Sequence, residues 1–321
     1  MAATATYFVG SGVDAFTPSP AGVTDTGSAI TLQGGDPYHV RGRLTDPATG
    51  EPTAVQACWF HFVVRGTGIT DKAPFLTFLN SEDVEVLKVL GSGTDSFTLQ
   101  VLTAAGFQQL GKWAMPDFSA DVAVDVQVDL PKGLIALYWN QGETVLKRGV
   151  DVSKIGDIAT FRIGVPSTFR GCTFSQVIVA AYNTIGHTVR IRRPSAVGSL
   201  AGWSGDAAAV SESAINDATA ISTSAEGAIT TFAGPALPAT AAGSVIKAVA
   251  VAARVRKDTA VAPTNIRAVL KVGGQVCEAP ANVPISDGYA GTSTVFPKNP
   301  QTGERWQIAE VNSEFGLKAT A

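Results

Sequence analysis

The sequence predicts an all-β protein whose strands pair antiparallel, in a sandwich or a barrel. Three observations lead to this fold class. Apolar residues alternate with polar ones at a period of two along most of the chain. Short stretches holding Gly, Pro, Asn or Asp separate the alternating runs, and the first 195 residues hold no apolar run of helical period and length. Such spacing favours antiparallel sheets over alternating strand–helix units.

The clearest strand is Val122–Asp129, with the sequence VAVDVQVD. Successive side chains of a strand point to opposite faces, so its four valines share one face, which we expect to be buried. The first 50 residues carry no recognisable motif, and they either complete this sandwich or form a contact arm. Further strands are expected at residues 57–65, 75–79, 84–90, 97–102, 134–139, 160–163, 172–181 and 189–193.

A change of composition after Pro194 predicts two domains, at residues 1–195 and 196–321. The segment 195–240 is rich in Ala, Ser, Gly and Thr, which is typical of a junction followed by short strands and loops. Within it, residues 207–218 are expected to form a short helix or a loop. Strand patterns return at residues 245–255, 266–272 and 294–296.

The low charge of the chain argues against a nucleic-acid partner, and its hydropathy argues against a membrane span. Only 16% of the residues are charged, and the formal net charge is −3. Phosphate binding needs a concentrated excess of Lys and Arg, and the densest group is only Arg190, Arg192 and Arg193, so we expect no nucleic-acid partner. No apolar stretch of about 18 residues occurs, so we expect no membrane span. The first residues lack a secretion-signal pattern, so we expect no signal peptide.

No pattern of cysteines predicts a metal, a cofactor or a disulfide framework. Cys58, Cys172 and Cys277 are odd in number and lack CxxC spacing, so we expect reduced thiols.

The histidines do not form a recognisable site either. His39, His61 and His187 are not at metal-ligand spacing, and no catalytic motif surrounds them. His61 alternates with Phe60 and Phe62, so its side chain leaves the face that these aromatic residues bury. We therefore expect His61 to face solvent or another domain.

A glycoside hydrolase would need two carboxyl groups about 5–9.5 Å apart. Asp125 and Asp129 share a strand face, but four strand residues separate their backbones by roughly 13 Å. The run Ser81–Glu85 is charged but lacks the Glu-x-Asp-x-x-Glu pattern of one hydrolase clan. We expect these carboxylates to be solvated strand ends, although partners on neighbouring strands stay open.

Residues 57–194 have a recognisable order of strands. An aromatic-rich strand, CWFHFVVRG, is followed by the pair VAVDVQVD and LIALYW, then by a short hairpin at Asn140–Glu143 and a late strand, CTFSQVIVAA. This order resembles the concanavalin-like or laminin-G-like jelly roll. The resemblance implies that the first domain is the larger antiparallel jelly-roll sandwich.

The end of the chain carries a second pattern, TVFPKNPQTGERWQIAEVNSEFGLK. It resembles a small β domain that recurs in virion proteins of tailed phages, and so implies a smaller β-sandwich domain after the jelly roll. Independently of the resemblance, Asn299-Pro300 followed by Gly303 predicts a turn. The matching positions are Phe296, Asn299, Pro300, Gly303, Trp306, Asn312, Phe315 and Gly316.

Together these resemblances imply a non-enzymatic structural component of a tailed-phage or gene-transfer-agent-like particle, such as a fibre, spike, decoration or tail accessory protein. Its expected location is the virion, after synthesis in the cytoplasm of a bacterial host. Its expected partners are other virion proteins and a host surface polysaccharide. We expect a homo-oligomer, with a trimer favoured, because closed symmetry is the usual way to satisfy extensive subunit contacts. Two alternatives stay open: a polysaccharide-degrading glycoside hydrolase and a free carbohydrate-binding module.

A sugar site on the larger domain would use exposed aromatic rings beside polar loop groups. Trp139 and Asn140 lie at the predicted hairpin, and Trp113 lies in a loop-like setting. Alternation places Tyr138 and Trp139 on opposite faces, so at least one of the two is expected to be buried. Trp113, Trp139 and Asn140 are therefore the candidate ligand-binding residues.

Overall fold

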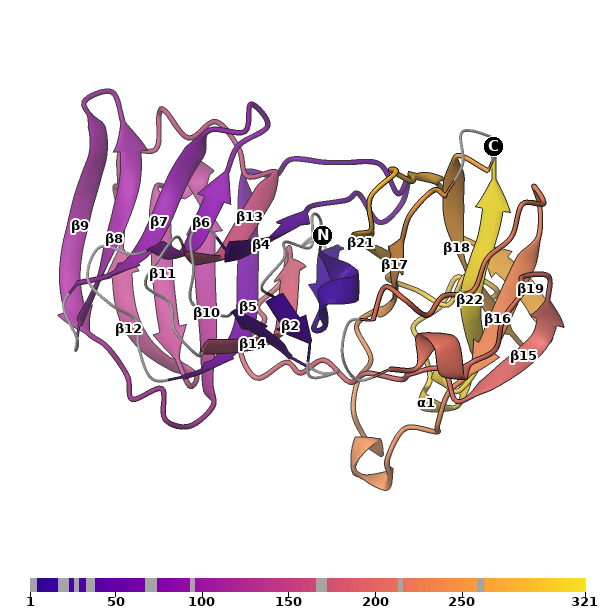
Figure 1. Cartoon of the computed structure of the whole chain (residues 1–321). Helices are drawn as coiled ribbons and strands as arrows, with labels where there is room; N and C mark the ends of the chain where they lie inside the picture. Colours follow the sequence, from indigo (N-terminus) through magenta and orange to yellow (C-terminus); the bar gives the residue numbers. More distant parts are fainter. Residues whose placement is uncertain are drawn as a thin grey trace.

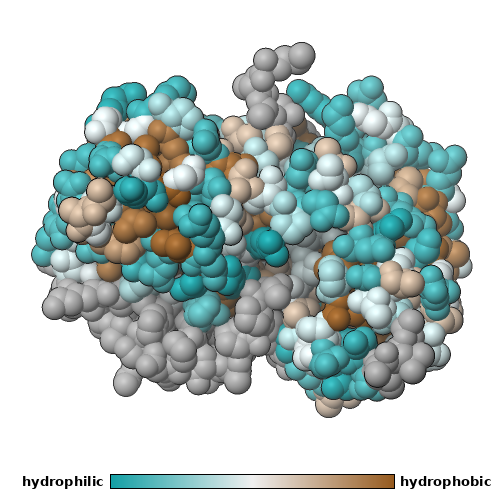
Figure 2. Space-filling model, turned by 90° about the horizontal axis from the view of Figure 1, so that it is seen from above, coloured by the Kyte–Doolittle hydropathy of each residue, from teal (hydrophilic) through white to brown (hydrophobic). Residues whose placement is uncertain are grey.

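The computed structural model describes residues 5–16, 23–25, 29–32, 38–66, 74–92, 96–165, 172–212, 216–258 and 263–321. It confirms the all-β fold class, with a larger and a smaller strand-rich part side by side (Figure 1). Within the described residues, the single α-helix is the four-residue α1 (Ile308–Val311). Hydrophilic residues cover much of the surface of both parts, and apolar areas lie among these hydrophilic residues on each part (Figure 2).

The larger part is a sandwich of two antiparallel sheets. The first sheet runs in the order β12 (Gly142–Lys147), β11 (Leu134–Trp139), β10 (Val122–Asp129), β5 (Ala57–Arg65), β14 (Cys172–Ala180), β3 (Ile30–Leu32) and β2 (Val23–Asp25), and β1 (Thr6–Gly10) also pairs with β14. The second sheet runs in the order β4 (Tyr38–Arg43), β13 (Thr160–Val165), β6 (Pro74–Leu79), β7 (Glu85–Gly91), β8 (Ser96–Thr103) and β9 (Gly106–Ala114).

Aromatic and branched side chains fill the space between the two sheets. The four alternating valines of β10 are buried in this core, as predicted. Phe60 on β5 packs edge-on against Phe161 of the opposite sheet, with ring centroids 4.7 Å apart, and against Phe78 at 5.3 Å. Each buried aromatic ring removes about 150–250 Å² from water, so these contacts across the sandwich dominate its stability.

The first 50 residues complete the sandwich and also reach the smaller part. β1 pairs with β14, and β4 pairs with β13 in the second sheet. β1 also contacts the strand β21 (Ala290–Phe296), and the hydroxyl of Ser293 donates to the Val9 carbonyl at 2.5 Å. The described residues of this segment therefore complete the sandwich, which is the first of the two alternatives raised from the sequence.

The smaller part sets one sheet against a two-stranded ribbon. The sheet runs in the order β15 (Ala196–Ala201), β16 (Ile229–Ala233), β22 (Glu314–Thr320), β18 (Asn265–Val272) and β19 (Gln275–Glu278), and β20 (Val283–Pro284) also pairs with β18. The ribbon is β17 (Val249–Val255) with β21. Val251, Leu270, Phe296 and Trp306 pack between sheet and ribbon.

The end of the chain folds as its turn chemistry predicts. The N–H of Gly303 donates to the Asn299 carbonyl at 2.8 Å, and Gly303 takes a φ of 74°, which favours glycine. The indole of Trp306 is buried and donates to the Phe296 carbonyl at 2.8 Å. A Cβ at Gly316 would lie 1.9 Å from the Thr230 carbonyl oxygen, which explains why a glycine follows Phe315.

One strand prediction is wrong. Residues 189–193 form no strand; they belong to an extended linker, in which the Val189 N–H donates to the Gln176 side chain at 3.1 Å. In the segment 207–218, the described residues form a loop with one 3₁₀ turn at Ala208–Val210, which agrees with the second of the two expected alternatives. The domain boundary at residue 195 stays a prediction, although this linker does lie between the last strand of the sandwich and β15.

Candidate ligand-binding face

The structure does not bring the three predicted sugar-binding residues together as one exposed site. Trp139 is 9% exposed and packs edge-on against Phe97 at 5.1 Å. Trp113 lies on β9 and not in the expected loop; it is partly buried and stacks on the same Phe97 ring, with centroids 5.6 Å apart. Asn140 is exposed, and its side chain accepts the Ala123 N–H at 2.9 Å. Their role in binding stays a prediction, with little accessible surface left on Trp139.

Asn140 owes its position to a tight turn. Asn140 and Gln141 take φ values of 46° and 73°, the left-handed pair that two-residue hairpins require. This turn joins β11 to β12.

Neither His61 nor Asp125 faces solvent, although solvent was one of the two alternatives expected for His61 and the expected surrounding of Asp125. His61 is 1% exposed and Asp125 is fully buried, and the His61 Nδ1 lies 2.9 Å from the Asp125 Oδ1. Both side chains do leave the aromatic core, but the linker after β14 covers them: the Thr184 hydroxyl donates to the same Asp125 oxygen at 2.7 Å. This burial leaves the pair no surface for a substrate.

Asp129 is not a solvated strand end either. It is 8% exposed, and its carboxylate accepts the Lys132 N–H at 3.3 Å and pairs with the Lys132 ammonium at 2.6 Å. It thereby caps the short 3₁₀ turn Leu130–Lys132. This carboxylate has a structural role at the end of β10.

The second sheet of the sandwich has a polar outer face. Its inner face holds core residues such as Phe161 and Ile163, and the residue between them, Arg162, therefore points outward. The strand register places one outward residue from each of the six strands in a single row across the sheet. We call this the polar row; from β4 to β9 it comprises Arg41, Arg162, Thr77, Lys88, Gln100 and Gln109.

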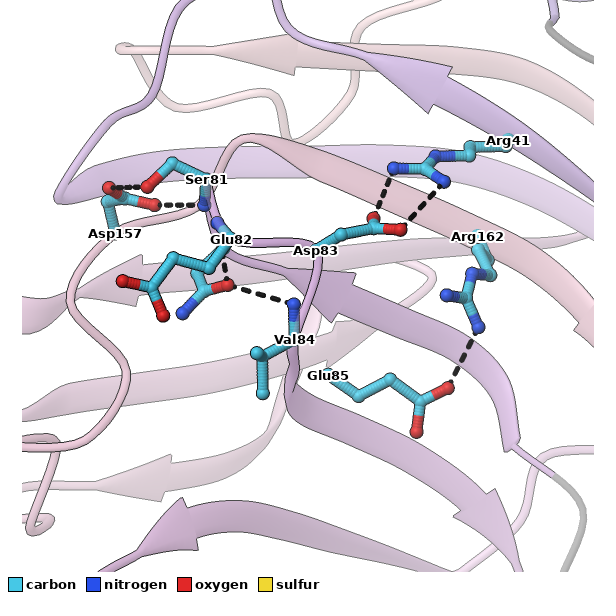
Figure 3. A network of polar contacts seen from close by, with 9 residues as sticks. Arg41, Ser81, Glu82, Asp83, Val84, Glu85, Asp157 and Arg162 are labelled. Atoms are coloured by element: carbon cyan, nitrogen blue, oxygen red, sulfur yellow. Dashed lines mark hydrogen bonds and ion pairs between the residues drawn. The ribbon is translucent and has the colours of Figure 1, made fainter.

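Ion pairs hold the charged members of the polar row in place. The Glu85 carboxylate receives the Arg162 guanidinium at 2.9 Å and the Lys88 ammonium at 2.5 Å. Arg41 reaches the Asp83 carboxylate with both of its terminal nitrogens (Figure 3). These side chains stay about a fifth to a half exposed, so their remaining hydrogen-bonding positions are open to a ligand.

The loop that carries Asp83 is itself rigidly built. The Asn80 side-chain oxygen accepts the Val84 N–H at 2.9 Å and the Glu82 N–H at 3.1 Å. Ser81 donates to the Asp157 carboxylate through its N–H at 2.7 Å and its hydroxyl at 2.8 Å (Figure 3). Asp83 takes a φ of 62°, an unusual conformation for a non-glycine residue, so the loop presents its carboxylate in a fixed direction.

An aromatic ring lies beside the polar row. Phe107 on β9 is 39% exposed, and the Lys88 ammonium lies 4.2 Å from its ring centroid. Sugar rings stack on such accessible aromatic faces while charged and amide side chains bind their hydroxyl groups. The sequence marked only the charged run Ser81–Glu85, because the row forms through strand register between distant segments.

The described part of the chain gives no sign of a metal centre or a membrane span. No group of three or more His, Cys, Asp or Glu side chains is placed to hold a metal ion among these residues. No helix among them has the length and apolar character needed to cross a membrane.

Comparisons with known proteins give only distant likenesses. No protein-family model matches the chain, and no curated protein matches it. The globular domain of T. cruzi calreticulin is 9% identical over 56% of this chain and 89% of that chain, with a TM-score of 0.42. A sialidase is 13% identical over 52% of this chain and 17% of its own, with a TM-score of 0.37. The receptor binding domain of botulinum neurotoxin D is 7% identical over 49% of this chain and 41% of its own, with a TM-score of 0.36.

Proposed function

We propose that this protein is a non-enzymatic structural component of a phage or phage-like particle, and that its larger part contacts a surface polysaccharide. The observation that carries the binding role is the polar row beside the exposed Phe107 ring. A cation, a carboxylate, two amides and an aromatic face then lie within one sheet surface. Polysaccharide recognition uses this mixture of side chains.

The rigidity of the face favours binding over mere solvation. Arg41, Arg162 and Lys88 are each held by a carboxylate, so they lose little side-chain freedom when a ligand arrives. Ordering a long side chain costs about 0.5–1.5 kcal/mol during association, and a pre-ordered face avoids much of that cost.

The particle role is supported by the resemblance of the chain end to small β domains of tailed-phage virion proteins. In this chain the matching residues have structural work, since Trp306 closes the smaller core and Gly303 completes the turn before it. The low charge of the chain suits contacts with other virion proteins and with further copies of itself in a trimer.

Binding to polysaccharide is tested by screening the full chain on an array of bacterial surface glycans and measuring the best hit by calorimetry. We expect Phe107→Ala to weaken binding at least tenfold. Leu146→Ala is the matched control, because Leu146 is also 39% exposed but lies on β12 of the other sheet. Equal affinities for wild type and Phe107→Ala would remove the polar face from the proposal.

Two further measurements separate the alternatives. Cryo-electron microscopy of intact particles from the source organism should show density for this chain, and its absence would contradict the virion role. New reducing ends released from the bound polysaccharide would instead favour a hydrolase. Glycan binding without density on particles would favour a free carbohydrate-binding module.

A further inference from the structure

The smaller part is an unequal sandwich. Among the described residues, five strands lie side by side in its sheet, whereas the facing ribbon has only β17 and β21. Adjacent strands lie about 4.8 Å apart, so the sheet spans roughly 19 Å between its outer strands and the ribbon roughly 5 Å. Phe315 and Leu317 of β22 pack against the core but remain only partly buried. Part of the inner face of the sheet therefore has no strand opposite it.

A cleft of about 1300 Å³ occupies this region and extends between the two parts, where Val9, Ile178 and Tyr182 of the larger part also line it. Phe232, Phe315 and Leu317 line it from the sheet. Every residue of β17 from Val249 to Val255 lines it from the ribbon. Alternate residues of a strand point to opposite faces, so a cleft that touches all of them borders the edge of the strand.

The edge of β17 that borders the cleft has no partner strand in the described part of the chain. β17 pairs with β21 on one side, from Val249 opposite Phe296 to Val255 opposite Ala290. In an antiparallel pair, every second residue directs its N–H and C=O away from the partner. These groups form a row of unused hydrogen-bonding positions, which can pair with an added strand.

We propose that the cleft beside β17 is a docking site for an extended, acidic segment of another polypeptide. The segment adds a third strand to the ribbon and directs alternate apolar side chains toward Phe315 and Leu317. This interaction is separate from the sugar-binding proposal, because the polar row lies on the larger sandwich.

Two features of the cleft favour such an occupant. Ile191 and Val245, which are 40% and 66% exposed, both line it and offer apolar contacts. The lining of the cleft also has a positive excess, in a chain whose net charge is −3, because it holds seven cationic residues and five acidic ones. Asp287, which does not line the cleft, pairs with Lys257 and reduces this excess from two to one. The cations are Arg190, Arg192, Arg193, Lys247, Arg254, Arg256 and Lys257, and the acids are Asp14, Glu212, Asp217, Asp258 and Glu310.

The test supplies the missing strand within the same molecule. A segment of alternating Val and Thr with Asp at both ends is fused after Ala321 through a flexible Gly/Ser linker of about 15 residues, which gives an effective concentration in the millimolar range. Hydrogen exchange is then measured along β17. We expect alternate β17 amides to exchange at least tenfold more slowly than in the unfused chain, and the Tm to rise.

Matched fusions test the stated chemistry of the segment. A fusion of the same composition, with its apolar residues grouped so that they do not alternate, should leave β17 exchange unchanged. A fusion with Lys in place of Asp at both ends should protect β17 less. Equal protection by all three fusions would overturn the proposal.

Two proline variants test strand pairing itself. Of the neighbours Ala252 and Ala253, one directs its N–H toward β21 and the other toward the cleft. Ala252→Pro and Ala253→Pro are each made in the alternating fusion. The variant whose Tm equals that of the unfused chain is the one that has lost the N–H facing the cleft. That variant should also lose the protection of β17. Retained protection in that variant would contradict strand addition.

Three other outcomes would also overturn the proposal. The first is that the alternating fusion would leave β17 exchange unchanged despite its high local concentration. The second is that the unfused chain would protect β17 by forming a dimer as its concentration rises, which would make a second copy the occupant. The third is that an oligogalacturonate would protect β17, which would make the cleft a saccharide site. The affinity of Phe107→Ala for glycans bears on none of these results, so the two proposals fail separately.

Discussion

The His61 Nδ1 lies 2.9 Å from the Asp125 Oδ1 on the outer side of the first sheet, and both side chains are buried. They come from paired positions on β5 and β10. Thr184, from the linker between the two parts, donates to the same Asp125 oxygen. The contact therefore fastens the start of the linker to the sandwich, instead of forming a site for a substrate.

Replacing Thr184 by valine should weaken this fastening. The change keeps the shape of the side chain but removes the donor to a buried carboxylate, which costs about 1.5–3 kcal/mol in free energy of unfolding. Urea denaturation of the full chain measures the loss. Thr184→Ser keeps the hydroxyl and is the control, so equal losses in both variants would show that packing, and not the hydrogen bond, matters at this position.

The alternation of apolar residues predicted the strands that build the core of the sandwich, such as β5 and β10, but it missed strands such as β9, whose residues are all exposed or half-buried. The valines of β10 and Phe60 on β5 face the interior as their period of two requires. The same rule correctly placed His61 on the face opposite to the aromatic residues, yet neither alternative expected for that face, solvent or another domain, included the linker. The error arose because alternation shows which face a residue occupies, whereas the linker that covers that face is irregular and carries no periodic signal.

The candidate binding face could not be predicted for a related reason. Arg41, Lys88 and Gln109 are far apart in sequence, and only the register of six strands brings them into one row. Register depends on pairing between strands, which a single sequence does not specify. Trp139 was a candidate sugar-binding residue because of its ring and its place beside a turn. It is instead buried in the core, because a large apolar ring gains more by burial.

Cys58 should resist alkylation while the protein is folded. Burial raises the pKa of its thiol to about 12, so almost no reactive thiolate exists at pH 8. Cys277 is only partly buried, and we expect iodoacetamide to modify it at least about 100-fold faster. Peptide mass spectrometry after timed labelling gives both rates. Modification of Cys58 should become rapid in 6 M urea if burial is the cause, and comparable rates in the native protein would contradict this account.

Protonation of Glu278 should make the smaller part less stable in acid. A hydrogen bond from Lys318 at 2.7 Å, helped by Arg267 at 3.0 Å, lowers the pKa of this carboxyl below its usual value. A group with a lowered folded-state pKa contributes its stability above the unfolded-state pKa and loses it as the pH falls through the folded-state pKa. Because the side chain is 28% exposed, we expect less than about 1 kcal/mol.

The measurement for Glu278 is the Tm between pH 6 and pH 3. The Tm of Glu278→Gln should fall less steeply over this range than that of the wild type, because the variant has no carboxyl to protonate at this position. Glu304→Gln is the control, since Glu304 is exposed. Parallel curves for wild type and Glu278→Gln would contradict the assignment.

Arg192 should anchor the far end of the linker to the smaller part. Its guanidinium lies 5.6 Å from the Phe315 ring, and burial lowers its pKa. The fork geometry of arginine allows it to donate to several carbonyls at once, and a lysine ammonium cannot reach them all. The carbonyls that accept from it belong to Gly234, Pro235, Val311, Asn312 and Ser313.

We expect Arg192→Lys to destabilise the protein by about 1 kcal/mol, because partly buried carbonyl groups lose their donors. Limited proteolysis should also cut the linker faster in this variant, since these hydrogen bonds tie the linker to the smaller part. Arg190→Lys is the matched control, because Arg190 is exposed on the same segment. If Arg192→Lys resists urea and protease as well as Arg190→Lys does, the linker is held by its backbone contacts and the guanidinium is dispensable.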